Sequence, residues 1–212
     1  IYRMSIIDSG GPLAFHHQHG ANIDLLDGRR RAIRRISYEK SLCYSHRPLR
    51  INEPFIVTIQ QVEGGWTGHL RIGLTRLNPS TLSPLSRLES LSSNDTWLVP
   101  ISSWDIPAPK RLLPTEVGSR VGVYLESISS STGRLHLILN DIDVIPSLPQ
   151  ISLDNPLYAF VDVYGSTKEV CITSATHSPD SLSSLCIRSV RSLLLSSSIS
   201  HSLLPQSIQC LF

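Results

Sequence analysis

Short segments in which apolar and polar residues alternate follow one another from about residue 13 to residue 172. Alternation with a period of two is typical of β-strands, and we expect strands at residues 55–59, 66–75, 121–125, 135–139 and 157–164. The pattern over 66–75 predicts one buried and one wetted face, whereas 157–164 is apolar on both faces, as a central strand is. Glu63, Gly64 and Gly65 supply the turn of a hairpin between the first two strands.

Turn residues also separate the later strands, for example Ser131-Thr132-Gly133 and Asn155-Pro156. The fold class that this pattern predicts is all-β, an antiparallel β-sandwich over residues 13–173. Residues 78–114 are rich in Pro, Ser and Leu and show no clear period. We expect them to form a long surface connection that carries Trp97 and Trp104.

The C-terminal part of the chain shows a different pattern. Its apolar residues recur at helical spacing and would form one stripe, made of Leu182, Leu185, Cys186, Val190, Leu193 and Leu194. Ser178, Pro179 and Asp180 precede the stripe and are typical of a helix start. Periodicity alone favours a helix docked on its own domain, but a helix this short and rich in Ser is marginal by itself and can also fold against a partner.

Composition and charge narrow the class of protein. The chain has 212 residues, of which 41% are hydrophobic and 17% charged, and its formal net charge is +2, which together describe a folded protein. The basic run at 29–31 and 34–35 has no aromatic platform beside it, so we expect a solvated strand or turn and no nucleic acid. No apolar run approaches the ~20 residues of a membrane span. Four cysteines without CxxC spacing fit reduced thiols and a cytoplasmic protein.

Candidate chemistry is sparse. His16, His17 and His19 lie together, but no HExxH or CxxC accompanies them, so we expect no metal and no cofactor. In a β-sandwich of the predicted kind, Asn22 and a His near the first strand are expected to hold loops by hydrogen bonds to backbone groups. Cys43 has His46 nearby, yet a buried strand cysteine is favoured over a nucleophile, and no GxSxG motif is present. We therefore expect that the protein is not an enzyme.

The C-terminal residues resemble a SOCS box. Ser181, Leu182, Cys186 and Val190 match the Elongin-binding box of SOCS-box proteins, here residues 181–190. The resemblance implies that Leu182, Leu185, Cys186 and Val190 contact Elongin C. Residues 202–212 resemble the cullin-selecting half, with Leu204, Pro205 and Ile208 as cullin-binding residues. The cullin-5 type is favoured, although a single proline stands where that class has Leu-Pro-x-Pro.

Four segments of the main domain resemble the neuralized homology repeat: FHHQHGANIDL (15–25), SYEKSLCYSHRPLRINEPFIVTI (37–59), GWTGHLRIGLT (65–75) and PLYAFVDVYGSTKEVCI (156–172). The resemblance implies a SPRY-like bent β-sandwich that recruits a substrate, joined to an α-helical SOCS-box appendage over 178–212. The chain departs from the family pattern at Asn140-Asp141, where Asn-Gly is usual, and at Ile145, which replaces a glycine.

These resemblances imply a substrate-recognition adaptor subunit of a ubiquitin ligase with Elongin B/C, a cullin and a RING protein as partners. Such an adaptor works by proximity, holding a protein substrate near the conjugating enzyme. The alternative is a stand-alone protein- or peptide-binding sandwich whose C-terminal helix is only structural. Substrate recognition is expected from loops, near Asn22, Gly64, Gly65 and Asp141.

Overall fold

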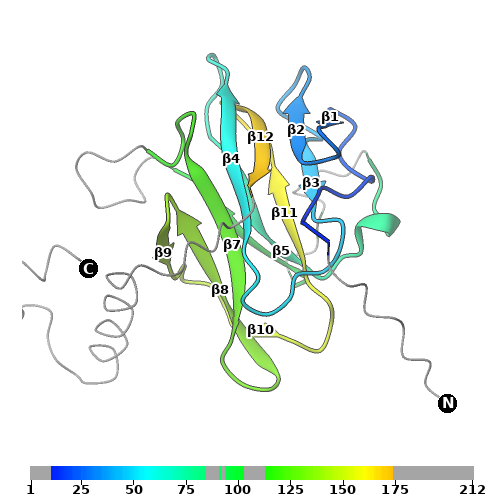
Figure 1. Ribbon diagram of the computed structural model, residues 1–212, viewed down its shortest axis with the longest axis vertical. Helices are drawn as coiled ribbons and strands as arrows, with labels where there is room; N and C mark the ends of the chain where they lie inside the picture. Colours follow the sequence, from blue (N-terminus) through cyan, green and yellow to red (C-terminus); the bar gives the residue numbers. More distant parts are fainter. Residues whose placement is uncertain (1–10, 85–90, 92–93, 103–112, 174–212) are drawn as a thin grey trace, which may run out of the picture. The chain divides into compact units, whose positions relative to one another are not determined.

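The computed structural model describes residues 11–84, 91, 94–102 and 113–173 (Figure 1). Apart from one 3₁₀ turn, η1 (Pro79–Thr81), the regular elements of these residues are β-strands. They are β1 (Ile23–Leu26), β2 (Arg31–Arg34), β3 (Leu42–Tyr44), β4 (Phe55–Val62), β5 (Arg71–Thr75), β6 (Thr96–Pro100), β7 (Arg120–Ser127), β8 (Thr132–Leu139), β9 (Ile142–Val144), β10 (Ile151–Ser152), β11 (Tyr158–Asp162) and β12 (Thr167–Thr173). The predicted SOCS-box appendage lies outside the described residues.

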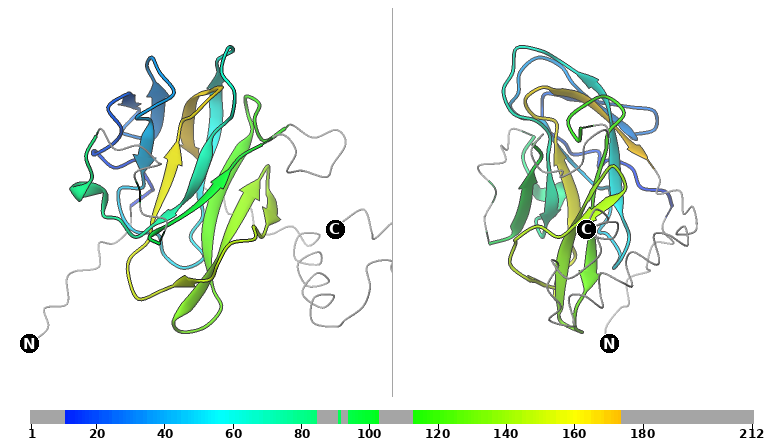
Figure 2. Two further views of the ribbon diagram at one scale, coloured as in Figure 1. Left: turned by 180° about the vertical axis from the view of Figure 1, so that it is seen from behind. Right: turned by 90° about the vertical axis from the view of Figure 1, so that its left-hand side faces the viewer.

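The strands form two antiparallel sheets, visible as two layers in the side view of Figure 2. The larger sheet has eight strands in the order β1-β2-β12-β4-β7-β8-β10, and β9 pairs with β8 beside β10. The smaller sheet has four strands in the order β3-β11-β5-β6. The prediction of an all-β antiparallel sandwich is therefore confirmed; its SPRY-like bend stays a prediction.

The core lies between the two sheets because alternate side chains of both point inward. Val57, Val121 and Leu137 of the larger sheet and Leu74 and Val161 of the smaller sheet are buried in one cluster. Phe15 and Phe55 meet in it edge to face, with ring centroids 6.1 Å apart. Burial of this apolar area is the main stabilising contribution to the sandwich.

The strand predicted at 157–164 is central, as expected. β11 lies between β3 and β5, and Val161 faces the main core while Phe160 faces a second cluster on the other side with Leu42 and Tyr44. Leu82, Leu91 and Leu98 pack on this second cluster. β11 has apolar residues on both faces because each face is covered by one of these two hydrophobic clusters.

Two details of the sequence-based fold are wrong. Gly64 and Gly65 do not close a hairpin, because β4 belongs to the larger sheet and β5 to the smaller one, and residues 63–70 cross between them. The second face of β5 is not wetted, since Gly73 and Thr75 are buried. Alternation reports which faces are covered locally, but it carries no information on which sheet a strand joins.

The segment 78–114 is only partly a surface connection. Its described residues include η1 and the edge strand β6, where Trp97 is 8% exposed, while Trp104 lies outside the described residues. Asn78 begins η1 by accepting a hydrogen bond from the Ser80 amide at 3.0 Å. The segment thus contributes the edge strand of the smaller sheet, and its Leu82 and Leu91 pack on the second cluster.

Candidate functional site

Several loops gather at one end of the larger sheet, at the top of Figure 1. The register places them together: Thr167, at the start of β12, pairs with Val62, at the end of β4, and Ile23 pairs with Arg34. Antiparallel neighbours alternate in direction, so the segments 35–40, 63–70 and 163–166 leave the sandwich at the same end, beside Asn22. We call these residues the loop end.

Arg34 ties the loop end together from inside. Its side chain is 0% exposed, and Nη2 donates hydrogen bonds to the carbonyl oxygens of Gly165 (2.6 Å) and Thr167 (3.2 Å). Nη2 also lies 3.5 Å from Glu63 Oε2, and the guanidinium faces the Trp66 ring at 5.9 Å. Burial lowers the pKa of Arg34, and the charge of Glu63 opposes this change. One buried cation thus joins β2 to the 63–70 and 163–166 loops.

Three aromatic rings form the surface of the loop end. Tyr38 meets Trp66 and Tyr164 edge to face, with centroid distances of 5.2 and 5.6 Å. Tyr38 and Trp66 are 38% and 39% exposed, and the neighbouring Ile36 is 80% exposed. We call Tyr38, Trp66 and Tyr164 the aromatic cluster. Exposed aromatic residues of this kind mark protein-binding surfaces more often than other exposed residues do.

A buried ion pair supports the aromatic cluster from below. The guanidinium carbon of Arg71 lies 4.1 Å from the centre of the Tyr164 ring. Arg71 Nε donates to Asp162 Oδ2 at 2.9 Å, and the hydroxyl of Ser41 donates to Asp162 Oδ1 at 2.7 Å. Because Asp162 is 3% exposed and fully engaged, the Tyr164 ring rests on a rigid base.

Asn22 holds the 35–40 segment in place, as the sequence predicted for loop-holding hydrogen bonds. Its Nδ2 donates to the carbonyl oxygens of Ser37 and of Glu39 (3.2 Å), and its Oδ1 accepts from the Ile36 amide at 3.0 Å. Around these bonds lies a hollow of about 440 Å³, lined by residues 21, 22, 35–37, 39 and 40.

The other predicted substrate residues lie at the same end of the larger sheet. Gly64 and Gly65 are exposed at the tip beyond β4, and Lys168 connects this tip to the 35–40 segment by contacting Glu63 Oε2 (3.3 Å) and the Arg35 carbonyl oxygen (2.9 Å). Asp141 is two strands away from β4, in the turn that joins β8 to β9. The structure thus brings the two glycines near the Asn22 segment and leaves Asp141 apart.

The Asn140-Asp141 turn does form a tight hairpin despite the missing glycine. Both residues have positive φ, +49° and +69°, as a two-residue type I′ turn requires. Asn140 Oδ1 accepts from the Arg120 amide at 2.8 Å, and Arg120 Nη1 pairs with Asp141 Oδ1 at 2.6 Å. These contacts stabilise left-handed backbone at residues other than glycine.

Sequence reasoning missed Tyr38, Trp66, Tyr164 and the buried Arg34 as a group. These residues are far apart along the chain and meet only after the loops fold together. One signal was present: Ile36 is an apolar residue amid charged ones in a segment that was expected to be solvated. The basic run itself lies in and beside β2, and its Arg34 is buried rather than solvated.

The candidate chemical groups have structural contacts. The Cys43 thiol is fully buried on β3, and burial raises its pKa, so the thiol is protonated at neutral pH. His16 Nδ1 accepts from the Gln18 amide at 2.9 Å, and its Nε2 lies 3.3 Å from the Ser80 hydroxyl. Within the described ranges, no cluster of His, Cys, Asp or Glu is arranged to hold a metal ion.

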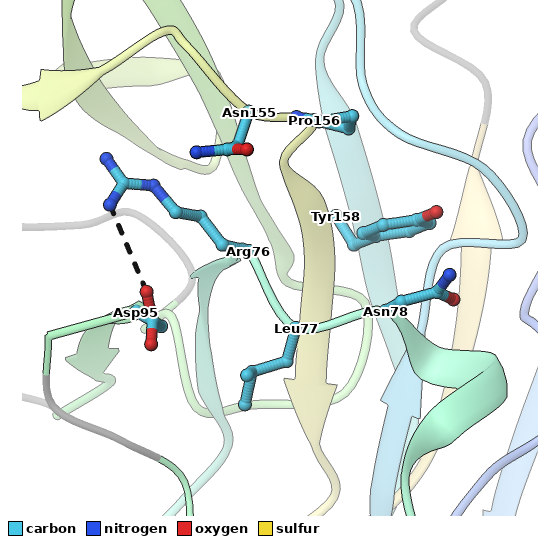
Figure 3. A pocket seen from close by; sticks show the side chains of 7 residues that line it. All are labelled: Arg76, Leu77, Asn78, Asp95, Asn155, Pro156 and Tyr158. Atoms are coloured by element: carbon cyan, nitrogen blue, oxygen red, sulfur yellow. Dashed lines mark ion pairs between the residues drawn. The ribbon is translucent and has the colours of Figure 1, made fainter.

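A second hollow of about 400 Å³ lies at the opposite end of β5 and β11, lined by Arg76, Leu77, Asn78, Asp95, Asn155, Pro156 and Tyr158 (Figure 3). Arg76 lies 3.9 Å from Asp95, stacks on Trp97 at 5.0 Å, and donates to the Ser152 carbonyl oxygen at 3.2 Å. Its guanidinium is therefore held by the protein itself.

In the part of the chain that is described, no helix is long and apolar enough to cross a membrane.

Comparisons with known proteins agree with this architecture. A family model described as Neuralized matches residues 15–174. Human Neuralized-like protein 2 is 29% identical and aligns over 82% of each chain. The mouse E3 ubiquitin-protein ligase NEURL1B is 31% identical over 76% of this chain and 28% of its own length. The crystal structure of the Drosophila melanogaster neuralized NHR1 domain superposes with a TM-score of 0.66 at 22% identity, covering 78% of this chain and all of that one.

The name of the mouse relative contradicts the expectation that the protein is not an enzyme, because an E3 ubiquitin-protein ligase is an enzyme. The expectation rested on the lack of a nucleophile or metal motif and on the resemblance to a non-catalytic adaptor subunit. Catalysis by positioning two reactants needs neither a nucleophile nor a metal, so the lack of these motifs does not exclude an enzyme. The predicted Elongin-binding residues Leu182, Leu185, Cys186 and Val190 and the cullin-binding residues Leu204, Pro205 and Ile208 lie outside the described residues.

Proposed function

The chain belongs to the Neuralized family, and on that premise we propose that it acts in ubiquitin conjugation by binding a protein substrate through the loop end. The observation that carries the proposal is the partly exposed aromatic cluster, fixed from within by Arg34 and Arg71. Support for the pathway comes from the relative named as an E3 ubiquitin-protein ligase. Holding a substrate close to the conjugating machinery raises the effective concentration of its lysines.

The chemistry of the loop end suits a protein partner. Trp and Tyr bury large areas with little loss of side-chain entropy, and they dominate the binding energy of protein interfaces. The hydrogen bonds and ion pairs of Arg34 and Asp162 fix the ring positions before binding, which lowers the entropy cost of association. Ile36, 80% exposed, extends the apolar surface beside Tyr38.

The four substrate residues expected from the sequence enter the same proposal. Asn22 shapes the segment that carries Ile36 and Tyr38, and Gly64 and Gly65 form the tip that precedes Trp66. Asp141 would contact only a partner large enough to extend from the loop end across the ends of β7 and β8. The expected order of importance is therefore the aromatic cluster first and Asp141 last.

The finer proposal concerns how the substrate reaches the ligase machinery. We propose that residues 181–190 bind Elongin C through Leu182, Leu185, Cys186 and Val190, and that Leu204, Pro205 and Ile208 select a cullin, favouring the cullin-5 type with its RING protein. This step is supported by the sequence pattern alone. A cytoplasmic location belongs to the same proposal and is supported by Cys43 and Cys171, which form no disulfide among the described residues.

The experiment compares ubiquitination in cells that lack the protein and are complemented with full-length variants. Trp66→Ala is the test, and Ile128→Ala is the matched control, because Ile128 is also exposed (42%) but follows β7 at the other end of the sheet. Quantitative mass spectrometry of ubiquitin-remnant peptides should show substrates restored by wild type and Ile128→Ala and lost with Trp66→Ala. Equal restoration by both variants, at equal protein levels, would remove the loop end from substrate binding.

A further inference from the structure

His136 lies in a set of ionisable side chains on the outer face of the larger sheet. It belongs to β8, where its neighbours Leu135 and Leu137 point into the core. Alternation therefore directs the imidazole to the opposite face, yet His136 is only 5% exposed. A buried histidine outside the core needs partners for both ring nitrogens.

Those partners are two carboxylates from different strands. Nε2 lies 3.0 Å from Glu126 Oε2 on β7, and Nδ1 lies 2.9 Å from Asp143 Oδ1 on β9. The Tyr124 ring stacks on the imidazole at 4.5 Å, and its hydroxyl donates to Asp143 Oδ2 at 2.8 Å. His136 thus bridges β7, β8 and β9 through side chains.

A count of donors shows which protonation state fits this geometry. A neutral imidazole has one N–H and one lone pair, whereas an imidazolium has two N–H donors. Carboxylate oxygens face both nitrogens at hydrogen-bond distance, and the Tyr124 hydroxyl, 2.9 Å from Nδ1, donates to Asp143, so only the charged ring donates to both carboxylates. We propose that Glu126, His136 and Asp143 form a proton-dependent latch, which ties β7, β8 and β9 together while the imidazole is protonated and loosens when it loses a proton.

The surroundings decide which contact is lost first. Glu126 is 44% exposed and Asp143 31%, so on deprotonation at Nε2 the Glu126 carboxylate turns to water while Nδ1–H stays on Asp143. The ionisable groups that face the ring are Tyr124 and Glu126 from β7 and Asp143 from β9. Arg134 lies on the same strand two residues away, opposite Glu126 in the register. Glu126 released from His136 therefore has Arg134 as its alternative partner.

The latch sits where the edge of the sheet changes partner. β9 pairs with Leu137–Leu139 of β8, and β10 pairs with Thr132 and Gly133, so His136 lies between these two short ladders. β9 has three residues, all half-buried, and few backbone bonds hold it. Side-chain contacts through Asp143 therefore contribute a large share of its attachment.

The contribution of His136 to the free energy of unfolding depends on pH in a definite direction. Burial lowers the pKa of His136, but hydrogen bonds and charges from Asp143 and Glu126 together raise it more, and the net change is upward. A histidine whose folded pKa is raised stabilises the fold below its unfolded pKa of about 6.5, and this stabilisation is lost as pH rises through the folded pKa. The latch is therefore closed below the folded pKa of His136 and opens as pH rises through it.

The test is an NMR titration of His136 in the full chain, combined with thermal unfolding between pH 5.5 and 8.5. We expect His136 to titrate above 6.5, and we expect Glu126→Gln and Asp143→Asn each to lower that value. As pH rises, wild type should lose more melting temperature than Glu126→Gln does, by about 3–5 °C for each unit by which the variant lowers the pKa of His136. The protection of the backbone amides of residues 142–144 against hydrogen exchange, corrected for the intrinsic pH dependence of exchange, should fall over the same pH range.

The control variant is Ile128→Ala, which changes an exposed side chain just after β7 without removing an ionisable group and should leave the pH dependence of wild type unchanged. Titration of His136 at or below 6.5 would overturn the proposal. Wild-type pH dependence in both carboxylate variants would also overturn it, as would amide protection of β9 that does not change with pH. Glu126→Gln keeps the test valid if Asp143→Asn fails to fold.

Discussion

Gly165 and Gly68 approach so closely that a Cβ built on Gly165 would lie 2.2 Å from the carbonyl oxygen of Gly68. Gly165 also has a φ of +60°, and Arg34 donates to its carbonyl oxygen. The loop before β12 and the crossing segment 63–70 are thus in direct backbone contact. The loop end is assembled around this contact, which a side chain at Gly165 would not permit.

Gly165→Ala should therefore destabilise the protein by about 1–3 kcal/mol, because the new methyl group forces the two loops apart at an unfavourable φ. Denaturant unfolding measures the difference. Gly64→Ala is the control, since nothing lies within 4 Å of a Cβ at that position, and its effect should stay within about 0.5 kcal/mol. Equal effects of the two variants would mean that the close approach does not limit the loop end.

Arg34→Leu should lower the free energy of unfolding by about 2–4 kcal/mol, because it leaves the buried carbonyl oxygens of Gly165 and Thr167 without this donor. Arg35→Leu removes an exposed arginine whose contact with Asp24 is 3.6 Å long, so its cost should be about 0–1 kcal/mol. Urea denaturation of the two variants side by side gives the comparison. A smaller loss for Arg34→Leu than for Arg35→Leu would contradict the role of Arg34 as the inner support.

The double change Leu182→Ala with Cys186→Phe should weaken Elongin C binding on the order of a thousandfold, because it deletes one buried side chain and overfills the next site. Calorimetry on purified proteins measures this effect. Leu204→Ala with Pro205→Ala is the matched variant, which should spare Elongin C binding and reduce cullin recruitment. Unchanged Elongin C affinity in the first variant would favour the alternative of a stand-alone binding sandwich.

His69 gives a pH dependence of the opposite sign to His136. Burial lowers the pKa of His69, whose Nδ1 lies 2.6 Å from the Ser166 hydroxyl. Its contribution to stability is therefore complete above the unfolded pKa of about 6.5 and is lost as pH falls below that value. His69→Gln should lower the value obtained by subtracting the melting temperature at pH 5 from that at pH 7.5. An unchanged value would show that His69 does not contribute to the loss of stability at low pH.

The sequence by itself was enough to locate most strands. Alternation over 121–125 and 135–139 predicted the cores of β7 and β8, and the apolar stretch at 157–164 predicted a central strand, because covered faces leave a period of two in the residues themselves. The resemblance of four short segments also gave the family that the comparisons confirmed. Asn22 could be predicted as a residue that holds a loop through the resemblance to a SPRY-like sandwich, because the backbone groups that it binds lie 14–17 residues along the chain.

The tertiary structure alone decided how the strands are shared and what the loops build. β4 and β5 read as a hairpin but join different sheets, because pairing depends on partners such as β12 and β11 that lie far along the chain. The aromatic cluster likewise unites Tyr38, Trp66 and Tyr164 from three loops. Local periodicity records burial at each residue, whereas contacts between distant residues depend on the whole chain folding at once. For that reason the aromatic cluster, unlike the strands, became visible only in three dimensions.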